Sequence, residues 1–91
     1  MSNKHFSIKI TGKVQGVFFR ASTKEKADEL GVKGFVRNEP DGSVYVEVEG
    51  AEYILDQFID WCTHGPERAR VEKMEPRPGE KKGFKDFEVR K

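Results

Sequence analysis

The sequence predicts an α+β domain of the ferredoxin-like, split βαβ type. Segments with strand and helix periodicity follow one another in the order β-α-β-β-α-β, and one short strand follows at the end. Each of the two helical segments carries one apolar stripe, so both can cover the same face of an antiparallel sheet. The length of 91 residues suits a single domain over residues 1–91.

The first half of the chain supplies a strand, a loop, a helix and a second strand. Apolar and polar residues alternate over residues 6–11, as in a half-buried strand. Residues 12–20 have no such period and are predicted to form a loop. A capping-box spacing that starts at Ser22 predicts the beginning of a helix, and Gly31 predicts its end. Residues 32–38 read as the second strand.

The second half continues in the same alternating manner. Valines at every second position make its first strand the clearest in the chain, and apolar residues at helical spacing follow it. We predict a turn at residues 39–42, a strand at 44–50 and a helix at 51–63. A weaker strand follows at 68–75, then a connection rich in Pro, Gly and Lys at 76–83, and a short last strand around Phe87.

This topology has a consequence for function. A right-handed crossover makes the first and second strands parallel, with the third strand antiparallel between them. The carboxyl ends of the first two strands therefore lie at the same edge of the sheet. We expect the loop that ends at Arg20 to face the strand end at Asn38.

Composition gives few limits on function, but its distribution is informative. Cys62 is the single cysteine, and there is no signal-peptide pattern and no apolar run near 18 residues, so we expect a cytoplasmic protein and, by default, a monomer. The net charge of +1 and pI near 7.8 differ from those of dedicated nucleic-acid binders, for which pI exceeds about 9. Residues 1–24 nevertheless contain five basic residues and no acid, which favours an anionic ligand unless the asymmetry is chance.

The loop itself has the properties of an anion site. It contains no proline, so every residue keeps its N–H, and Gly12 and Gly16 allow the backbone angles that turn successive N–H groups inward. A helix N-terminus follows, with its partial positive charge. Arg20 adds a planar donor fork that suits phosphate oxygens. A solvated arginine before a helix is the simpler alternative.

Other phosphate and metal sites fit the sequence poorly. The Walker and dinucleotide glycine patterns are both missing. Val14 stands six residues before Arg20, where a cysteine phosphatase would have its nucleophile, and Cys62 lies on an apolar helix face. His5 and His64 are far apart in sequence, lack neighbouring ligands and are expected at the surface. We therefore expect no metal and no cofactor.

Such a site favours one class of phosphate compound. A phosphomonoester has a poor alkoxide leaving group, which usually needs a general acid or a metal. The leaving group of an acyl phosphate is a carboxylate, whose conjugate acid has a pKa near 4. Such a leaving group needs no proton. Asn38 could then hold the attacking water through its amide carbonyl. The simpler alternative is that Asn38 only begins the turn before Glu39, which is a common role of asparagine.

The two segments that carry this argument resemble the acylphosphatases. The stretch ITGKVQGVFFR, residues 10–20, is similar to the first signature of that family, and GFVRNEPDGSVYVEVEG, residues 34–50, is similar to the second. Length and element order agree as well, so the resemblance covers essentially the whole chain. It implies metal-free hydrolysis of the carboxyl-phosphate bond without a phospho-enzyme, and a sheet order of 4-1-3-2 with the fifth strand at an edge.

The resemblance also assigns residues to roles. The catalytic arginine and asparagine of the family fall on Arg20 and Asn38. The phosphate-binding loop falls on Gln15, Gly16, Val17, Phe18, Phe19 and Arg20. The implied substrate is a small acyl phosphate, with inorganic phosphate as product and inhibitor, and neither nucleic acid nor membrane is implied as a partner. At least one of Phe18 and Phe19 is expected in the core rather than against substrate.

Two non-catalytic functions remain as alternatives. RNA-recognition domains share the predicted fold, but their aromatic motif belongs on the third strand, where this chain has Tyr45 with acids on the same face. An inactive, regulatory relative is the other, as in the hydrogenase-maturation carbamoyltransferases that carry such a domain. Filled catalytic positions argue against it.

Overall fold

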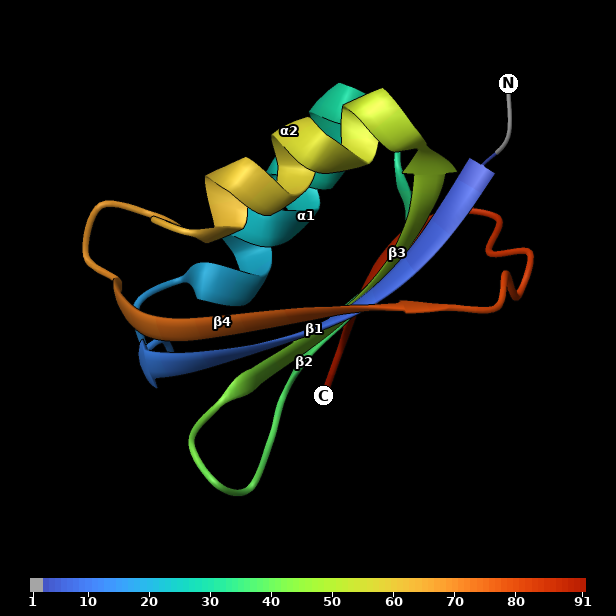
Figure 1. Ribbon diagram of the computed structural model, residues 1–91. Helices are drawn as coiled ribbons and strands as arrows, with labels where there is room; N and C mark the ends of the chain where they lie inside the picture. Colours follow the sequence, from blue (N-terminus) through green and yellow to red (C-terminus); the bar gives the residue numbers. More distant parts are fainter. Residues whose placement is uncertain (1–2) are drawn as a thin grey trace.

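The elements follow the predicted order along residues 3–91, the part of the chain that the computed structural model describes (Figure 1). They are β1 (Asn3–Lys13), α1 (Phe19–Leu30), β2 (Lys33–Asn38), β3 (Val44–Ala51), α2 (Glu52–Cys62), β4 (Arg70–Gly79) and β5 (Phe87–Arg90).

The strands form one five-stranded sheet in the order β4-β1-β3-β2-β5. β3 lies antiparallel between β1 and β2, so the predicted crossover topology is confirmed. β4 pairs antiparallel with β1 at one edge, as expected. β5 runs parallel to β2 at the other edge, which makes the sheet mixed rather than purely antiparallel. The carboxyl ends of β2 and β5 therefore meet at the same side of the sheet.

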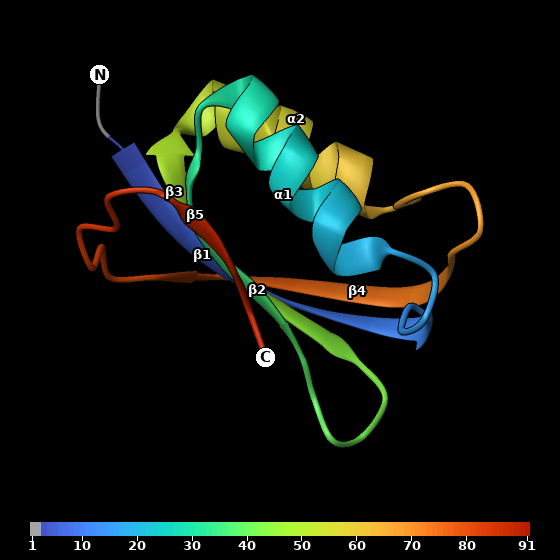
Figure 2. The same ribbon diagram turned by 180° about the vertical axis from the view of Figure 1, so that it is seen from behind.

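Both helices cover one face of the sheet, as Figures 1 and 2 show from opposite sides. The sheet presents alternate residues of its strands to them, because side chains on a strand alternate between faces. This inward set is Ile8 and Ile10 of β1, Val36 of β2, and Val44, Val46 and Val48 of β3. Leu55 and Phe58 of α2 pack against it, and both are fully buried. Neither helix combines the length and apolarity needed to cross a bilayer.

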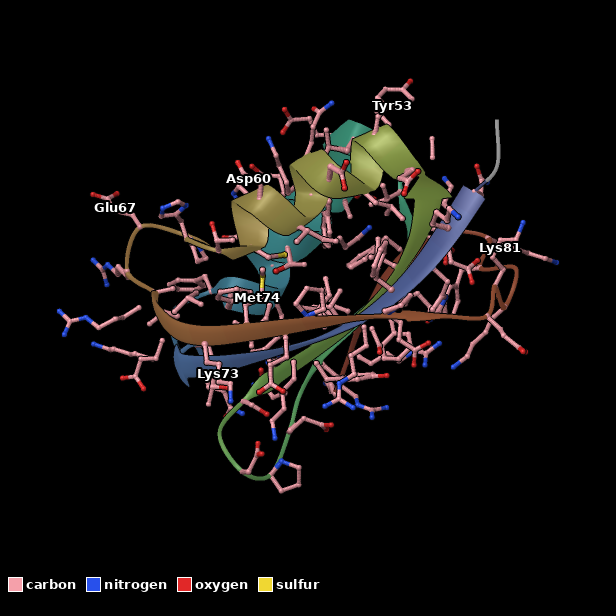
Figure 3. The ribbon with its side chains drawn as sticks, viewed as in Figure 1. Tyr53, Asp60, Glu67, Lys73, Met74 and Lys81 are labelled. Atoms are coloured by element: carbon pink, nitrogen blue, oxygen red, sulfur yellow. The ribbon has the colours of Figure 1, made fainter. Side chains whose placement is uncertain are left out.

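β4 is longer than the sequence predicts. Its side chains alternate, with Met74 pointing toward α2 and Lys73 pointing away (Figure 3). The strand ends at Gly79 rather than at residue 75, because Pro76 and Pro78 still pair with β1. Proline is tolerated on an edge strand, where its missing N–H can face away from the sheet. Much of the predicted connection over residues 76–83 is therefore strand.

The start of α1 differs from the capping-box prediction. The helix begins at Phe19, so Ser22 lies within it and caps nothing. Phe19 is 2% exposed and stacks at a tilt against Trp61, with 6.0 Å between ring centroids. This contact with α2 overrides the local capping signal. The end of the helix at Gly31 is confirmed, and its φ of 76° is one that glycine adopts readily.

The other face of the sheet carries a buried charged cluster, formed by His5, Glu47 and Glu49. The expectation that His5 lies at the surface is wrong, since this residue is 4% exposed. Its ring nitrogens lie 2.8 Å from Glu49 Oε2 and 3.1 Å from Glu47 Oε1. Residues 82–84 cover the cluster and donate their N–H groups to the Glu49 carboxylate. The segment before β5 is thus fastened to the sheet by a carboxylate.

Loss of the Glu49 carboxylate should weaken the protein at neutral pH more than in acid. Burial alone would raise the pKa of Glu49, but hydrogen bonds from the Lys82 N–H, from His5 and from the next backbone N–H groups hold it below 4.5. The carboxylate therefore contributes stability above about pH 4.5, and this contribution is lost as pH falls through the lowered pKa. Glu49→Gln should lower the free energy of unfolding at pH 7 and flatten its decline below pH 4.5.

Urea titrations at several pH values measure this effect. Glu67→Gln is the matched control, because Glu67 is exposed on the loop before β4 (Figure 3). An identical acid profile for wild type and Glu49→Gln would contradict the assigned role.

Candidate active site

A pocket of about 440 Å³ opens where the N-terminus of α1 meets the carboxyl ends of β2 and β5. Its lining residues are Val14, Gly16, Phe18, Phe19, Arg20, Ala21, Asn38, Val89 and Lys91. The predicted juxtaposition of Arg20 and Asn38 is confirmed, because both residues line this pocket. The volume falls within the range of small-molecule sites, roughly 300–1,000 Å³.

The loop between β1 and α1 is held by every second or third side chain. Val14, Val17 and Phe19 are buried, with exposures of 1%, 5% and 2%. Gly16 and Phe18, which lie between them, are exposed. The buried side chains fix the loop to the core and leave its intervening backbone toward solvent. Of the two phenylalanines, Phe19 belongs to the core as expected, whereas Phe18 is 75% exposed.

The two glycines of the predicted loop have different reasons to be glycine. Gly12 still belongs to β1, at a bulge where the pairing with β4 shifts register. A Cβ there would lie 2.2 Å from the Arg70 carbonyl oxygen, so a side chain would separate the strands. Gly16 has a φ of 73° and open space around it. Only Gly16 serves the loop conformation, and the loop is shorter than the predicted 12–20.

The N-terminus of α1 faces the pocket without a cap. The first helical bond runs from the Ser22 N–H to the Phe18 carbonyl, at 3.0 Å. The N–H groups of residues 18–21 precede it and have no acceptor in the helix. Phe18, at the N-cap, offers no side-chain acceptor, and no acid lies in the first turn. These donors and the helix dipole favour an anion at this point.

Arg20 sits in the first turn of α1, not in the loop where it was predicted, and β5 orients it. Its Nη1 donates to the carbonyl oxygen of Arg90 at 3.3 Å. One turn later, Lys24 Nζ donates to the Phe87 carbonyl at 3.1 Å. Two cationic side chains thus tie α1 to the edge strand. The guanidinium keeps other N–H donors for a ligand in the pocket.

Gln15 connects the loop to the β2–β3 hairpin. Its Nε2 donates to the carbonyl oxygens of Glu39 at 2.8 Å and Ser43 at 2.9 Å. Neither Gln15 nor Val17 is among the lining residues of the pocket. Phosphate binding through the backbone N–H groups of these two residues stays a prediction. The side chain of Gln15 sets the distance between the loop and the strand end that carries Asn38.

Asn38 closes the pocket from the sheet side. It is the last residue of β2 and pairs with Val44 of β3. Its Oδ1 is buried and accepts no hydrogen bond from any group in residues 3–91. An unpaired buried acceptor costs about 1–3 kcal/mol, and in native structures such a group calls for an explanation.

The side chains that most often act as nucleophiles toward phosphorus do not line the pocket. Its lining residues carry no hydroxyl, thiol, imidazole or carboxylate side chain, and Lys91 supplies the one amine. Cys62 is fully buried in α2, and burial raises the pKa of its thiol far above the usual value. No cluster of three or more His, Cys, Asp or Glu residues with metal-ligand geometry occurs within residues 3–91. The pocket therefore offers anion binding and one amide.

Four lining residues were missed from the sequence: Val14 and Ala21, which adjoin the predicted loop residues, and Val89 and Lys91 near the end of the chain. The signal that could have found the last two is the position of the fifth strand. A strand at the β2 edge that runs parallel to β2 brings its carboxyl end beside Asn38, and β5 does so with Arg90 opposite Arg37. Its parallel direction was not predicted.

Comparison with known proteins identifies the family. The family model described as acylphosphatase matches residues 6–89, nearly the whole chain. The chain belongs to the acylphosphatase family. The resemblance seen in the two signature segments is confirmed. An acylphosphatase of Rubrobacter xylanophilus is 47% identical over 91 residues, which cover 96% of this chain and 80% of that protein.

Solved structures agree with this assignment. An acylphosphatase from Coxiella burnetii superposes with a TM-score of 0.93 at 33% identity, over 97% of this chain and 93% of that one. Full-length HypF in its phosphate- and nucleotide-bound form contains a similar unit, with a TM-score of 0.89 and 30% identity. That match covers 99% of this chain but 12% of HypF. The same fold therefore occurs both in small proteins and as part of larger chains.

Removal of the Gln15 side chain should loosen the acylphosphatase pocket and destabilise the fold. Gln15→Ala removes two hydrogen bonds, although the Glu39 and Ser43 carbonyls each keep one backbone N–H donor, so the free energy of unfolding should fall by about 1–2 kcal/mol. Urea denaturation measures the change. The matched control is Gln57→Ala, at an exposed position of α2, which should stay within about 0.5 kcal/mol of wild type. Equal stability of the two variants would remove Gln15 from this role.

Proposed function

We propose that this protein hydrolyses the carboxyl-phosphate bond of small acyl phosphates by direct attack of water, with neither a metal nor a phospho-enzyme. The observation that carries the proposal is the pocket itself. It joins an uncapped helix N-terminus and Arg20 to Asn38, and its lining residues include no hydroxyl, thiol, imidazole or carboxylate side chain. Membership of the acylphosphatase family supports the same reaction.

The phosphate group would occupy the positive end of the pocket. The N–H groups of residues 18–21 lack helical acceptors and can donate to its oxygens. The guanidinium of Arg20 can donate to two oxygens at once, as its planar fork allows. Lys91 adds a further positive charge to the lining. These groups neutralise the charge that gathers on the equatorial oxygens in the transition state.

The leaving group explains why so few polar groups suffice. As the water oxygen bonds to phosphorus, the bond between phosphorus and the carboxyl oxygen breaks, and its electron pair leaves with the carboxylate. A carboxylate whose conjugate acid has a pKa near 4 needs no proton at neutral pH. The products are a carboxylate and inorganic phosphate, and the proton of the attacking water remains on the phosphate or passes to solvent. Inorganic phosphate fits the same donors and should inhibit.

Asn38 would hold the attacking water. Its Oδ1 is buried and has an unused acceptor, and a half turn about the Cβ–Cγ bond exchanges the amide oxygen and nitrogen. That turn would present the oxygen to the pocket, where a water molecule that donates to it gains a fixed direction. The presence of Asn38 in the same pocket as the helix N-terminus and Arg20 supports this role, because the water must lie beside the bound phosphate to attack in line.

The alternative is a non-catalytic module. The likeness to a small part of HypF supports it, since there the domain serves a much larger chain. An RNA-binding module, in which bases would stack on the outer face of the sheet, has less support. Phe35, on the outer face, is 3% exposed and covered by the Arg90 guanidinium at 3.9 Å from its ring centroid. The cytoplasmic location and the monomeric state stay predictions.

Hydrolysis of benzoyl phosphate tests the proposal. Purified protein in excess EDTA should hydrolyse it with turnover unchanged by added Mg²⁺ or Zn²⁺. Arg20→Lys is the matched variant, because it keeps the charge but loses the donor fork. We expect its inhibition constant for inorganic phosphate to rise about tenfold and its kcat/KM to fall by at least as much.

Three outcomes would count against the proposal. Wild-type protein without activity would favour the binding module. Activity lost in EDTA and restored by a metal ion would overturn the metal-free mechanism. Equal phosphate inhibition of wild type and Arg20→Lys would remove Arg20 from phosphate binding.

Asn38→Ala should separate binding from turnover. The variant keeps the helix N-terminus and Arg20, so inorganic phosphate should inhibit it as it inhibits wild type. Loss of the group that holds the water should lower kcat about 100-fold, or about 3 kcal/mol, as for other single polar groups that act in a transition state. Steady-state kinetics measure both quantities, and circular dichroism checks the fold. A kcat within threefold of wild type would exclude Asn38 from the reaction.

A further inference from the structure

Phe18 combines exposure with an unfavourable backbone. Among the large hydrophobic residues in positions 3–91 it is the most exposed, at 75%, although its neighbours Val17 and Phe19 are both buried. Its φ of 61° and ψ of 26° are left-handed, a region that disfavours side chains other than those of Gly, Asn and Asp. The core gains little from this side chain, so the stability of the fold does not explain it.

The position of Phe18 in the helix makes the choice of residue more informative. It is the N-cap of α1, where Asn, Asp, Ser or Gly would be favoured. A polar cap would satisfy the same N–H groups that the proposed phosphate site needs. An apolar residue leaves them available, but a small one would do so equally well. The large aromatic ring therefore calls for a second reason.

The lining of the pocket supplies that reason. Phe18 forms part of it with Val14, Ala21 and Val89, so part of the lining is apolar. Val89 is itself 41% exposed and comes from β5, so the loop and the edge strand each contribute an exposed apolar side chain. Arg20 and Lys91 form the cationic part of the lining. A ligand that fits both parts has an anionic end and an apolar end.

We propose that Phe18 and Val89 form a subsite for the acyl part of the substrate, and that the preferred acyl phosphates carry an aromatic or branched apolar group. This inference rests on the proposed function. The phosphate would bind to the helix N-terminus and Arg20, and the acyl group would extend between the two exposed apolar side chains. An aromatic acyl group could pack on the Phe18 ring edge-to-face or offset-stacked.

Contacts with the acyl group persist through the reaction, because that group does not change its size or apolar character when the phosphorus–oxygen bond breaks. Such uniform binding lowers KM and leaves kcat almost unaltered. Phe18 is therefore a specificity-determining residue, and its effect should be visible in KM and in the comparison of acyl groups.

The test compares benzoyl phosphate with acetyl phosphate. For wild type, KM for benzoyl phosphate should be lower by about tenfold, and Phe18→Ala should reduce that preference about fivefold to tenfold through KM. Val89→Ser, which changes the residue that β5 contributes to the subsite, should reduce it about threefold and serves as the second variant if Phe18→Ala folds poorly. Tyr53→Ala is the matched control, since Tyr53 is 57% exposed and projects outward from α2 (Figure 3).

A preference within twofold of wild type in both folded variants would overturn the subsite. A loss that is equal for benzoyl and acetyl phosphate would also overturn it, since that pattern indicates a distorted phosphate loop. Binding of benzylphosphonate and methylphosphonate, measured by calorimetry, gives the same comparison without turnover. If wild type hydrolyses neither acyl phosphate but binds benzylphosphonate more tightly in a Phe18-dependent manner, the proposed function fails and the subsite stands.

Discussion

The burial of Val14, Val17 and Phe19 is the constraint on which the rest of the site depends. These side chains hold a short loop against the core at three points, so the backbone between them has little freedom. Phe19 also determines where α1 begins, because its ring packs on Trp61 of α2. The direction of the helix axis, and with it the direction of the unpaired N–H groups, follows from an apolar contact. The packing of apolar side chains therefore sets the direction in which the unpaired N–H donors point.

The site is assembled from elements that the sheet topology brings to one edge. β2 contributes Asn38, β5 contributes Val89, Lys91 follows directly after β5, and α1 contributes Arg20. The anion-binding groups and the amide of the proposed reaction therefore come from different elements. Gln15 and Arg20 then set the spacing, since each donates hydrogen bonds to backbone carbonyls of another segment. The polar contacts that position the site therefore lie around the pocket rather than inside it.

Sequence reasoning was accurate where rules act locally or through topology. Periodicity of two or 3.6 residues identified every element, and the handedness of the crossover placed Arg20 opposite Asn38. It was inaccurate where a distant contact decides. Ser22 has a capping spacing, but Phe19 starts the helix by packing on α2. Pro76 marks a connection by composition, yet pairing with β1 keeps it in a strand. His5 is buried because two carboxylates and residues 82–84 surround it. None of these partners is visible in a local window.

The bond from Arg20 to the Arg90 carbonyl spans 70 positions along the chain. This hydrogen bond depends on β5, a strand of four residues at the sheet edge. Short elements at an edge open locally more readily than the rest of a sheet. Opening of β5 would release the guanidinium from its anchor and would also withdraw Phe87, which is 3% exposed and packs on Phe58 of α2, from the core. The orientation of Arg20 is therefore coupled to the packing of the sheet edge.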